Sequence, residues 1–211
     1  MQRATKGNLK NIIIDAILSS ADEYYEMAGV PIYKAPEYFL NVNVAKTIAE
    51  QFPKVGYRLE MQVKELMSLF DISDKEVLNP DLLRFSGNFD LLLISRDNLK
   101  PRHVIELKRH LGRRAMKIEA RRIAALCIQN HFRKQLKTGF IVTISRIKSK
   151  TSRAIPADEK IESRIDDVQD EIANLGNFSV SGLYYHCKNG EYGYGEHESL
   201  LVSVIEIKLL E

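Results

Sequence analysis

The sequence predicts an α/β (α+β) fold in which a mixed central β-sheet is flanked by helices. Two observations carry this prediction. Apolar residues recur at helical spacing in some segments and alternate or run continuously in others, in the order helix, helix, three strands, helix, strand, helix, two strands. In addition, the 211 residues are 45% hydrophobic and 28% charged, as in one globular domain with a substantial core. Helices packed on a sheet bury such a set of elements.

Four helices are predicted from apolar spacing and from residues that favour helix ends. The first covers residues 9–27, where apolar side chains recur at helical spacing. The second begins at Pro36 and Glu37, because a proline suits the first helical turn and an acid favours the positive end of the helix dipole. Two later helices are expected over residues 113–136 and 158–175 on the same apolar spacing.

Six strands are predicted, and the second and third form a hairpin. Residues 57–63 alternate apolar and polar side chains, which is typical of a half-buried strand. The runs FDLLLIS and HVIEL are almost continuously apolar, and the segment SRDNLKPR between them carries turn residues. The last three strands are expected at residues 140–147, 180–186 and 200–209.

We expect a single domain over residues 1–211, because no Pro-, Gly- or Ser-rich tract divides the chain. Its core is expected at about residues 36–147. The helix at 9–27 and the helix-plus-hairpin segment at 158–211 are expected as additions to that core.

The compartment is predicted from two features of the sequence. The N-terminal segment lacks the uninterrupted apolar stretch of a signal peptide, and no apolar run reaches the length of a membrane span. The two cysteines, Cys127 and Cys187, provide neither a disulfide framework nor a zinc site. We therefore expect a cytoplasmic protein with no membrane partner.

Charge is distributed unevenly along the chain. Between Lys100 and Lys150 there are fifteen Lys or Arg residues and two acids, a balance of +13, whereas the whole chain carries +3 and the rest therefore −10. Such asymmetry favours a polyanionic partner, with nucleic acid ahead of a membrane surface. The alternative is a solvated basic surface balanced by acidic helices elsewhere in the same fold.

The segment from Phe89 to His110 carries charged residues on strands that are otherwise apolar. Asp90 lies near the start of one strand, and Glu106 and Lys108 lie two residues apart on the next, so the latter two project from one sheet face. Inward-pointing charges cost free energy unless they pair or hold a metal ion. Two nearby carboxylates suit Mg²⁺ or Mn²⁺, and an adjacent ammonium group would neutralise charge during phosphodiester hydrolysis.

This arrangement resembles the PD-(D/E)xK nuclease superfamily, whose members have a restriction-endonuclease-like core. The match consists of Asp90 on one strand, fifteen further residues, and Glu106-Leu107-Lys108 on the next strand, followed by a helix and another strand. The order of elements over residues 36–147 is similar to the common core of the family. Phe89 stands where the motif has proline, a frequent variation in the family.

The resemblance implies a metal-dependent nuclease with Mg²⁺, or Mn²⁺, as the cofactor. In the family, the strand aspartate and the first acid of the ExK motif hold the metal ion, which assigns this role to Asp90 and Glu106. The lysine of the motif, here Lys108, positions or activates the attacking water. Many members also have a glutamate on the first core helix, and Glu37 is the candidate catalytic residue at that place. Because most of the family acts on DNA, the expected substrate is DNA.

Basic residues follow Lys108 directly. Four of them fall at spacings of four, three and four, which predicts a single stripe along the following helix. Such a stripe would hold backbone phosphates that lead into the site. The expected nucleic-acid-binding residues are Arg109, His110, Arg113, Arg114, Lys117 and Arg121, with His110, Arg114, Lys117 and Arg121 forming the stripe.

Three alternatives remain open at the level of sequence. A second ExK sequence, Glu206-Ile207-Lys208, has Glu191 fifteen positions upstream, but Glu191 lies in a glycine-rich loop and no basic helix follows. The charged trio before it could also be a structural ion-pair cluster, in which case the chain is a non-catalytic nucleic-acid- or protein-binding module of the same fold, or a regulatory subunit. Finally, the apolar stripe at 158–175 fits either a core helix or the seam of a homodimer.

Overall fold

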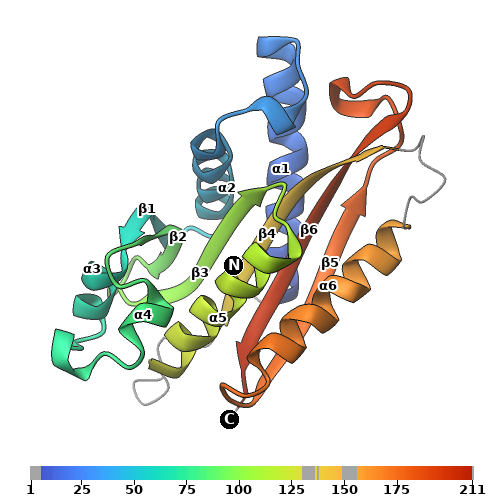
Figure 1. Cartoon of the computed structure of the whole chain (residues 1–211). Helices are drawn as coiled ribbons and strands as arrows, with labels where there is room; N and C mark the ends of the chain where they lie inside the picture. The colour runs from blue at the N-terminus through green and yellow to red at the C-terminus, as the bar shows by residue number, and fades with distance from the viewer. Residues whose placement is uncertain (1–5, 130–135, 137, 149–155, 211) are drawn as a thin grey trace.

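The computed structural model describes residues 6–129, 136, 138–148 and 156–210, and it confirms the predicted fold class. A mixed sheet of six strands has the order β1-β2-β3-β4-β6-β5 (Figure 1). Only the β3–β4 pair is parallel, and the other neighbouring strands are antiparallel. The strands are β1 (Val55–Gln62), β2 (Asn88–Ser95), β3 (Pro101–Arg109), β4 (Thr138–Lys148), β5 (Phe178–His186) and β6 (Glu198–Leu209).

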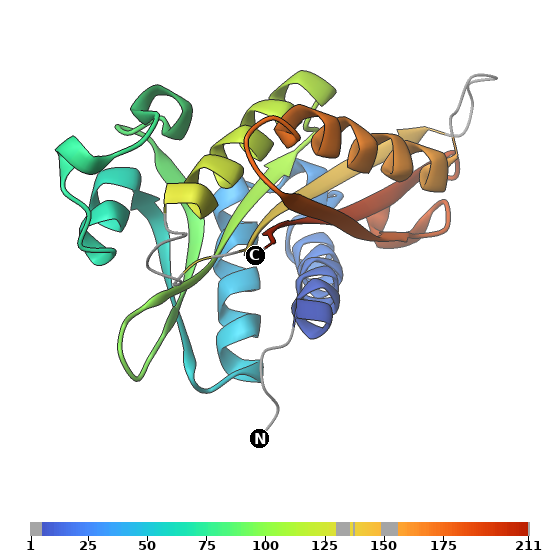
Figure 2. The same ribbon diagram turned by 90° about the horizontal axis from the view of Figure 1, so that it is seen from below.

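Helices cover both faces of the sheet. Figure 2 shows α1 and α2 on one face and α5 and α6 on the other, while α3 and α4 lie beside β1 at one end (Figure 1). None of the described helices is long and apolar enough to cross a membrane. The helices are α1 (Lys6–Ala28), α2 (Glu37–Gln51), α3 (Val63–Leu69), α4 (Pro80–Leu83), α5 (Arg113–Gln129) and α6 (Ala157–Ile172), with 3-10 turns η1 (Ile32–Lys34), η2 (Asp74–Glu76) and η4 (Glu191–Gly193).

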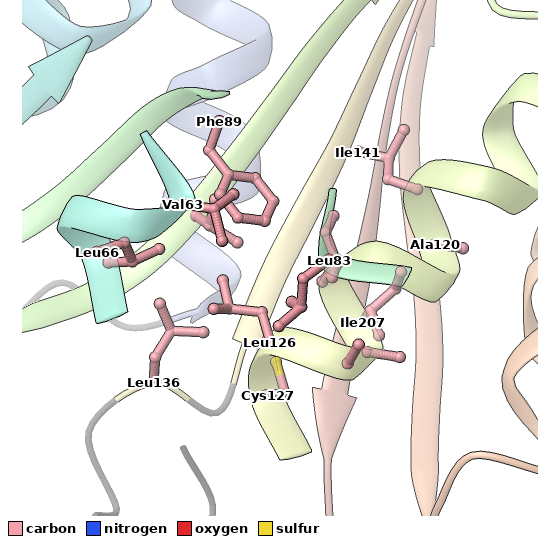
Figure 3. Packing of buried hydrophobic residues seen from close by; sticks show 14 of the residues in the cluster. Val63, Leu66, Leu83, Phe89, Ala120, Leu126, Cys127, Leu136, Ile141 and Ile207 are labelled. Carbon is pink, nitrogen blue, oxygen red and sulfur yellow. The ribbon is translucent and has the colours of Figure 1, made fainter. Parts of the chain in front are cut away.

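The central strands are apolar almost throughout because they are buried on both faces. In β4, Ile141 packs into the cluster beneath α3, α4 and α5, whereas Val142 packs into the cluster beneath α1 and α2. Figure 3 shows the first cluster, in which Leu83, Phe89 and Leu126 meet from three different elements. Two separate cores therefore hold the helices on the sheet, one on each face.

Helix α5 lies unusually close to the sheet. A Cβ atom added at Gly139 would lie 2.5 Å from Ile123 Cγ2 and 2.8 Å from Val104 Cγ1, so only glycine permits this approach. The close packing brings the polar residues of α5 to the strand that carries the ExK motif, which matters for the site described below.

The structure differs from the sequence-based expectations in three places. Residues 63–83 carry α3, η2 and α4, which were not expected. Helix α5 ends at Gln129, and residues 130–135 of the expected helix lie outside the described residues. Strand β6 lies between β4 and β5, so the C-terminal segment completes the central sheet rather than extending a finished core.

Helix α6 is a core helix. Ile161, Val168 and Ile172 are buried, and the helix packs against β5, β6 and α5 of its own chain. The apolar stripe of α6 is therefore covered within the chain, and the expectation that this stripe forms a homodimer seam is wrong.

Candidate active site

The site lies where β2 and β3 separate. The ladder between these strands ends at the pair Leu91 and Ile105, while β3 continues to pair with β4 as far as Arg109. Beyond the last pair, Asp90 takes over from the backbone, because its Oδ2 accepts the N–H of Leu107 at 2.8 Å. The carboxylate of Asp90 is thereby fixed in the gap between the two strands.

Lys108 stands at the centre of three carboxylates from three elements. Its Nζ lies 2.7 Å from Asp90 Oδ2 of β2, 3.1 Å from Glu37 Oε1 of α2 and 3.4 Å from Glu106 Oε2 of β3. Glu37 occupies the first turn of α2, and its Oε2 accepts the backbone N–H of Arg109 at 3.4 Å. The structure thus brings together all four residues to which the sequence assigned catalytic roles.

The titration behaviour of the site follows from its burial and its crowded charges. Burial, followed by the negative charge of Asp90, raises the pKa of Glu106 well above its ordinary value, although Lys108 and Arg122 act in the opposite direction. Burial opposes the positive charge of Lys108, but the carboxylates of Glu106 and Asp90 outweigh it and raise the pKa of that amine. Lys108 is therefore charged, and the Asp90–Glu106 pair is a place where an added cation is favourable.

Arg122 of α5 forms the floor of the site. Its Nη1 lies 3.0 Å from Glu106 Oε1, and its Nη2 and Nε donate to the carbonyl oxygens of Asn88 at 2.6 Å and Leu83 at 3.1 Å. The guanidinium group also stacks over the ring of Phe89, 3.9 Å from its centroid. Arg122 therefore orients Glu106 and ties β2, β3, α4 and α5 together.

The sequence analysis did not single out Arg122 or its partner Glu119, although a signal was present. Glu119 Oε2 lies 3.4 Å from Arg122 Nη1, and both side chains are buried. Glu119 falls three residues after Met116 and Arg122 four residues before Leu126, so both occupy the apolar arc of α5. Charged residues at core spacing indicate buried partners, and counting only apolar residues hides them.

The donor set is suited to a Mg²⁺-type ion. Among the described residues, no three His, Cys, Asp or Glu side chains are grouped so that they alone could hold a metal ion. Mg²⁺ is commonly bound by one or two carboxylates together with waters and substrate phosphates. Asp90 Oδ2 and Glu106 Oε2, which both face Lys108 Nζ, satisfy this smaller requirement.

Most of the expected phosphate-binding stripe is paired with acids of α6. Arg113 Nε and Lys117 Nζ lie 3.2 and 3.6 Å from the carboxylate of Asp167, and Lys117 Nζ lies 3.4 Å from Glu171 Oε2. Arg121 also pairs with Glu171. These contacts line a shallow groove between α5 and α6. The alternative of a basic surface balanced by acidic helices of the same fold describes these three cations.

Arg114 and Arg109 occupy different surroundings from that paired stripe. Arg114 lines the groove, and no carboxylate of the described chain forms an ion pair with it. Arg109 follows Lys108 on β3 and so projects from the opposite sheet face, where its Nη1 donates to Tyr33 O at 3.0 Å.

His110 does not lie on the stripe, which corrects the expectation. Helix α5 begins only at Arg113, so helical spacing does not extend back to His110. His110 has a φ of 54°. Its ring meets that of Tyr33 edge-on, with centroids 5.9 Å apart.

The second ExK sequence gathers no acids around a lysine. Glu206 alternates with Ile205 and Ile207, which pack beneath α5 and α6, so it points to the other sheet face. There its Oε2 lies 3.2 Å from Lys10 Nζ of α1. Its setting is a structural ion pair, unlike the cluster around Lys108.

No protein-family model, curated protein or solved structure matches this chain. The case for a function therefore depends on the geometry of the site.

The paired groove yields a first prediction. Replacing Glu171 with glutamine releases Lys117 and Arg121 from their shared acid, so the affinity for DNA measured in EDTA should rise, with the salt slope steeper by about one to two. Fluorescence anisotropy at several salt concentrations measures both quantities. Glu162→Gln removes an exposed acid from the same helix and is the control, because no ion pair of Glu162 is found among the described residues. An equal response in both variants would show that only net charge matters.

Proposed function

We propose that this chain is a metal-dependent nuclease of the PD-(D/E)xK type that hydrolyses phosphodiester bonds in DNA. The observation that carries the proposal is the convergence of Asp90, Glu106 and Glu37 on the amine of Lys108 at the fork between β2 and β3. An ion-pair cluster that served only stability would be a poor use of buried charge.

Each residue has a role that follows from its position. Asp90 and Glu106 would hold Mg²⁺ or Mn²⁺, which supplies a Lewis acid and lowers the pKa of a bound water. Lys108, held charged by its carboxylate neighbours, orients the attacking water and neutralises charge that develops on the phosphate. Glu37 fixes Lys108 from the side of α2, and its second oxygen meets the backbone of β3. Arg122 holds Glu106 from below.

The direct test is cleavage of linear, circular and single-stranded DNA by the purified protein. We expect products with Mg²⁺ or Mn²⁺ and none with EDTA or in the Asp90→Asn variant, because both remove the metal site. Comparing the three substrates also separates endonuclease from exonuclease action, since only an endonuclease opens the circle. Cleavage that persisted in EDTA, or that survived Asp90→Asn, would contradict the proposal.

A second candidate function is supported by one observation. Lys108 and Arg122 already neutralise Glu106 within the chain, as expected if the cluster is structural and the protein is a non-catalytic nucleic-acid- or protein-binding module. Such a module should bind DNA equally well with and without EDTA and should never cut it. The cleavage assay therefore separates the two candidates when anisotropy measurements of binding accompany it.

A further inference from the structure

A second group of cations lies on α6 and on the loop between β3 and α5. Arg164 of α6 is only 7% exposed, and its guanidinium group donates to Thr143 Oγ1 at 3.0 Å and to Leu111 O at 3.5 Å. Among the described residues, no carboxylate forms an ion pair with Arg164. A buried guanidinium group without a counter-charge is unfavourable, so its retention requires an explanation.

Lys160 and His110 belong to the same group. Burial, followed by the charge of Arg164, lowers the pKa of Lys160, which lies one turn earlier on α6. Burial, followed by the charges of Arg109, Arg146 and Lys160, lowers the pKa of His110. These groups are thus close enough to repel one another.

The counter-charges of this region are used elsewhere. Glu198 pairs with Arg146, and Asp167 pairs with Arg113, while Lys160 and Arg164 have no ion pair within the described part of the chain. Residues 149–155, which join β4 to α6 in the sequence, contain no acid. The negative charge that would balance this group is therefore expected to come from outside the chain.

The group lies next to the candidate active site on the same sheet face. Thr143, which accepts a hydrogen bond from Arg164, is the register partner of Lys108 across β3 and β4. Arg164 is therefore one strand away from the catalytic lysine. An anion bound by Arg164 would be a near neighbour of a phosphate at Asp90 and Glu106.

We propose that Arg164, Lys160 and His110 form a phosphate-binding subsite that holds a nucleic-acid phosphate next to the one being cleaved. Naming the ligand as a nucleic-acid phosphate rests on the proposed function. Binding of the anion itself needs no metal ion, because these residues are all hydrogen-bond donors when charged. The subsite can therefore be tested apart from catalysis.

The first experiment uses inorganic phosphate and the full chain in EDTA. Titration should shift the side-chain NMR signals of Arg164 and His110 saturably, with chloride at equal ionic strength as the reference. Lys160→Ala, at a half-buried position, should weaken phosphate binding about tenfold. Lys46→Ala, which removes an exposed lysine from α2, should leave binding unchanged. Arg164→Lys, which keeps the buried charge but loses the planar fork, should also weaken binding. Equal phosphate affinity in the wild type and in both subsite variants would overturn the proposal.

The second experiment uses labelled duplex DNA in EDTA, with either a 5′-phosphate or a 5′-hydroxyl end. Lys160→Ala should reduce the salt slope of binding by about one. A loss that is equal for both duplexes assigns an internal backbone phosphate to the subsite, whereas a loss confined to the phosphorylated duplex assigns a terminal phosphate. An unchanged affinity and slope for both duplexes would overturn the subsite.

The two proposals fail in different ways. Phosphate binding at Arg164 without any metal-dependent cleavage would leave the subsite standing and refute the nuclease function. Metal-dependent cleavage with no effect of Lys160→Ala on phosphate or DNA binding would refute the subsite and leave the nuclease function standing.

Discussion

Replacing Lys108 with alanine is expected to slow metal-dependent cleavage by about a hundredfold to a thousandfold, as the loss of one well-placed electrostatic group does in other active sites. The amine is the one cation that contacts Asp90, Glu106 and Glu37 together within the described residues. Without it, the attacking water loses its orientation, and charge on the phosphate is left to the metal ion alone.

The fold should survive this change when metal is present. Removing Lys108 leaves three carboxylates facing one another, so the variant should be less stable than the wild type in EDTA and should recover on addition of Mg²⁺, which binds the native state only. Thermal unfolding followed by circular dichroism measures the recovery, and single-turnover cleavage measures the rate.

Lys208→Ala provides the matched control for Lys108→Ala. Lys208 is the lysine of the second ExK sequence, in β6, and its removal should leave the cleavage rate unchanged. If Lys108→Ala cuts DNA at the wild-type rate, or if Lys208→Ala is equally impaired, the catalytic role of Lys108 is excluded.

Replacing Arg122 with alanine is expected to produce the largest loss of stability, about 3–5 kcal/mol in the free energy of unfolding, as found when one partner of a buried ion pair is removed. Arg122 is 3% exposed and contacts the carboxylate of Glu106, two backbone carbonyl groups and the ring of Phe89. Its loss leaves these acceptors without their donor inside the protein.

Urea denaturation of Arg122→Ala measures this loss, and Arg121→Ala on the same helix is the control. The side chain of Arg121 is 50% exposed and pairs with Glu171 at the surface, so its removal should change stability by less than about 1 kcal/mol. Similar losses in the two variants would show that Arg122 does not hold the site together.

Sequence patterns predicted the strands and the long helices because each has a strong local signal. The apolar runs of β2 and β3 and the turn between them define a hairpin, and residues 6–28 carry helical spacing. Helices α3 and α4, with seven and four residues, are too short to show a period. The place of β6 between β4 and β5 depends on contacts between distant segments, which no local pattern encodes.

The candidate site was only partly predictable for a similar reason. Asp90, Glu106 and Lys108 follow from a motif, and Glu37 from the resemblance to a family. Arg122 and Arg164, the two buried arginines that support the site from α5 and α6, are charged residues on apolar helix faces. The stripe was misjudged at His110 because spacing says nothing about where a helix begins.

Mn²⁺ binding followed by electron paramagnetic resonance tests the central claim most directly, because it needs no knowledge of the substrate. The central claim is that Asp90 and Glu106 together hold one divalent cation. We predict one saturable Mn²⁺ site that Mg²⁺ displaces, that is lost in the Asp90→Asn and Glu106→Gln variants, and that is retained in Glu206→Gln, where the altered acid belongs to the Lys10 ion pair on the other sheet face. A wild-type protein that binds no Mn²⁺, or variants of Asp90 and Glu106 that bind it unchanged, would contradict the account.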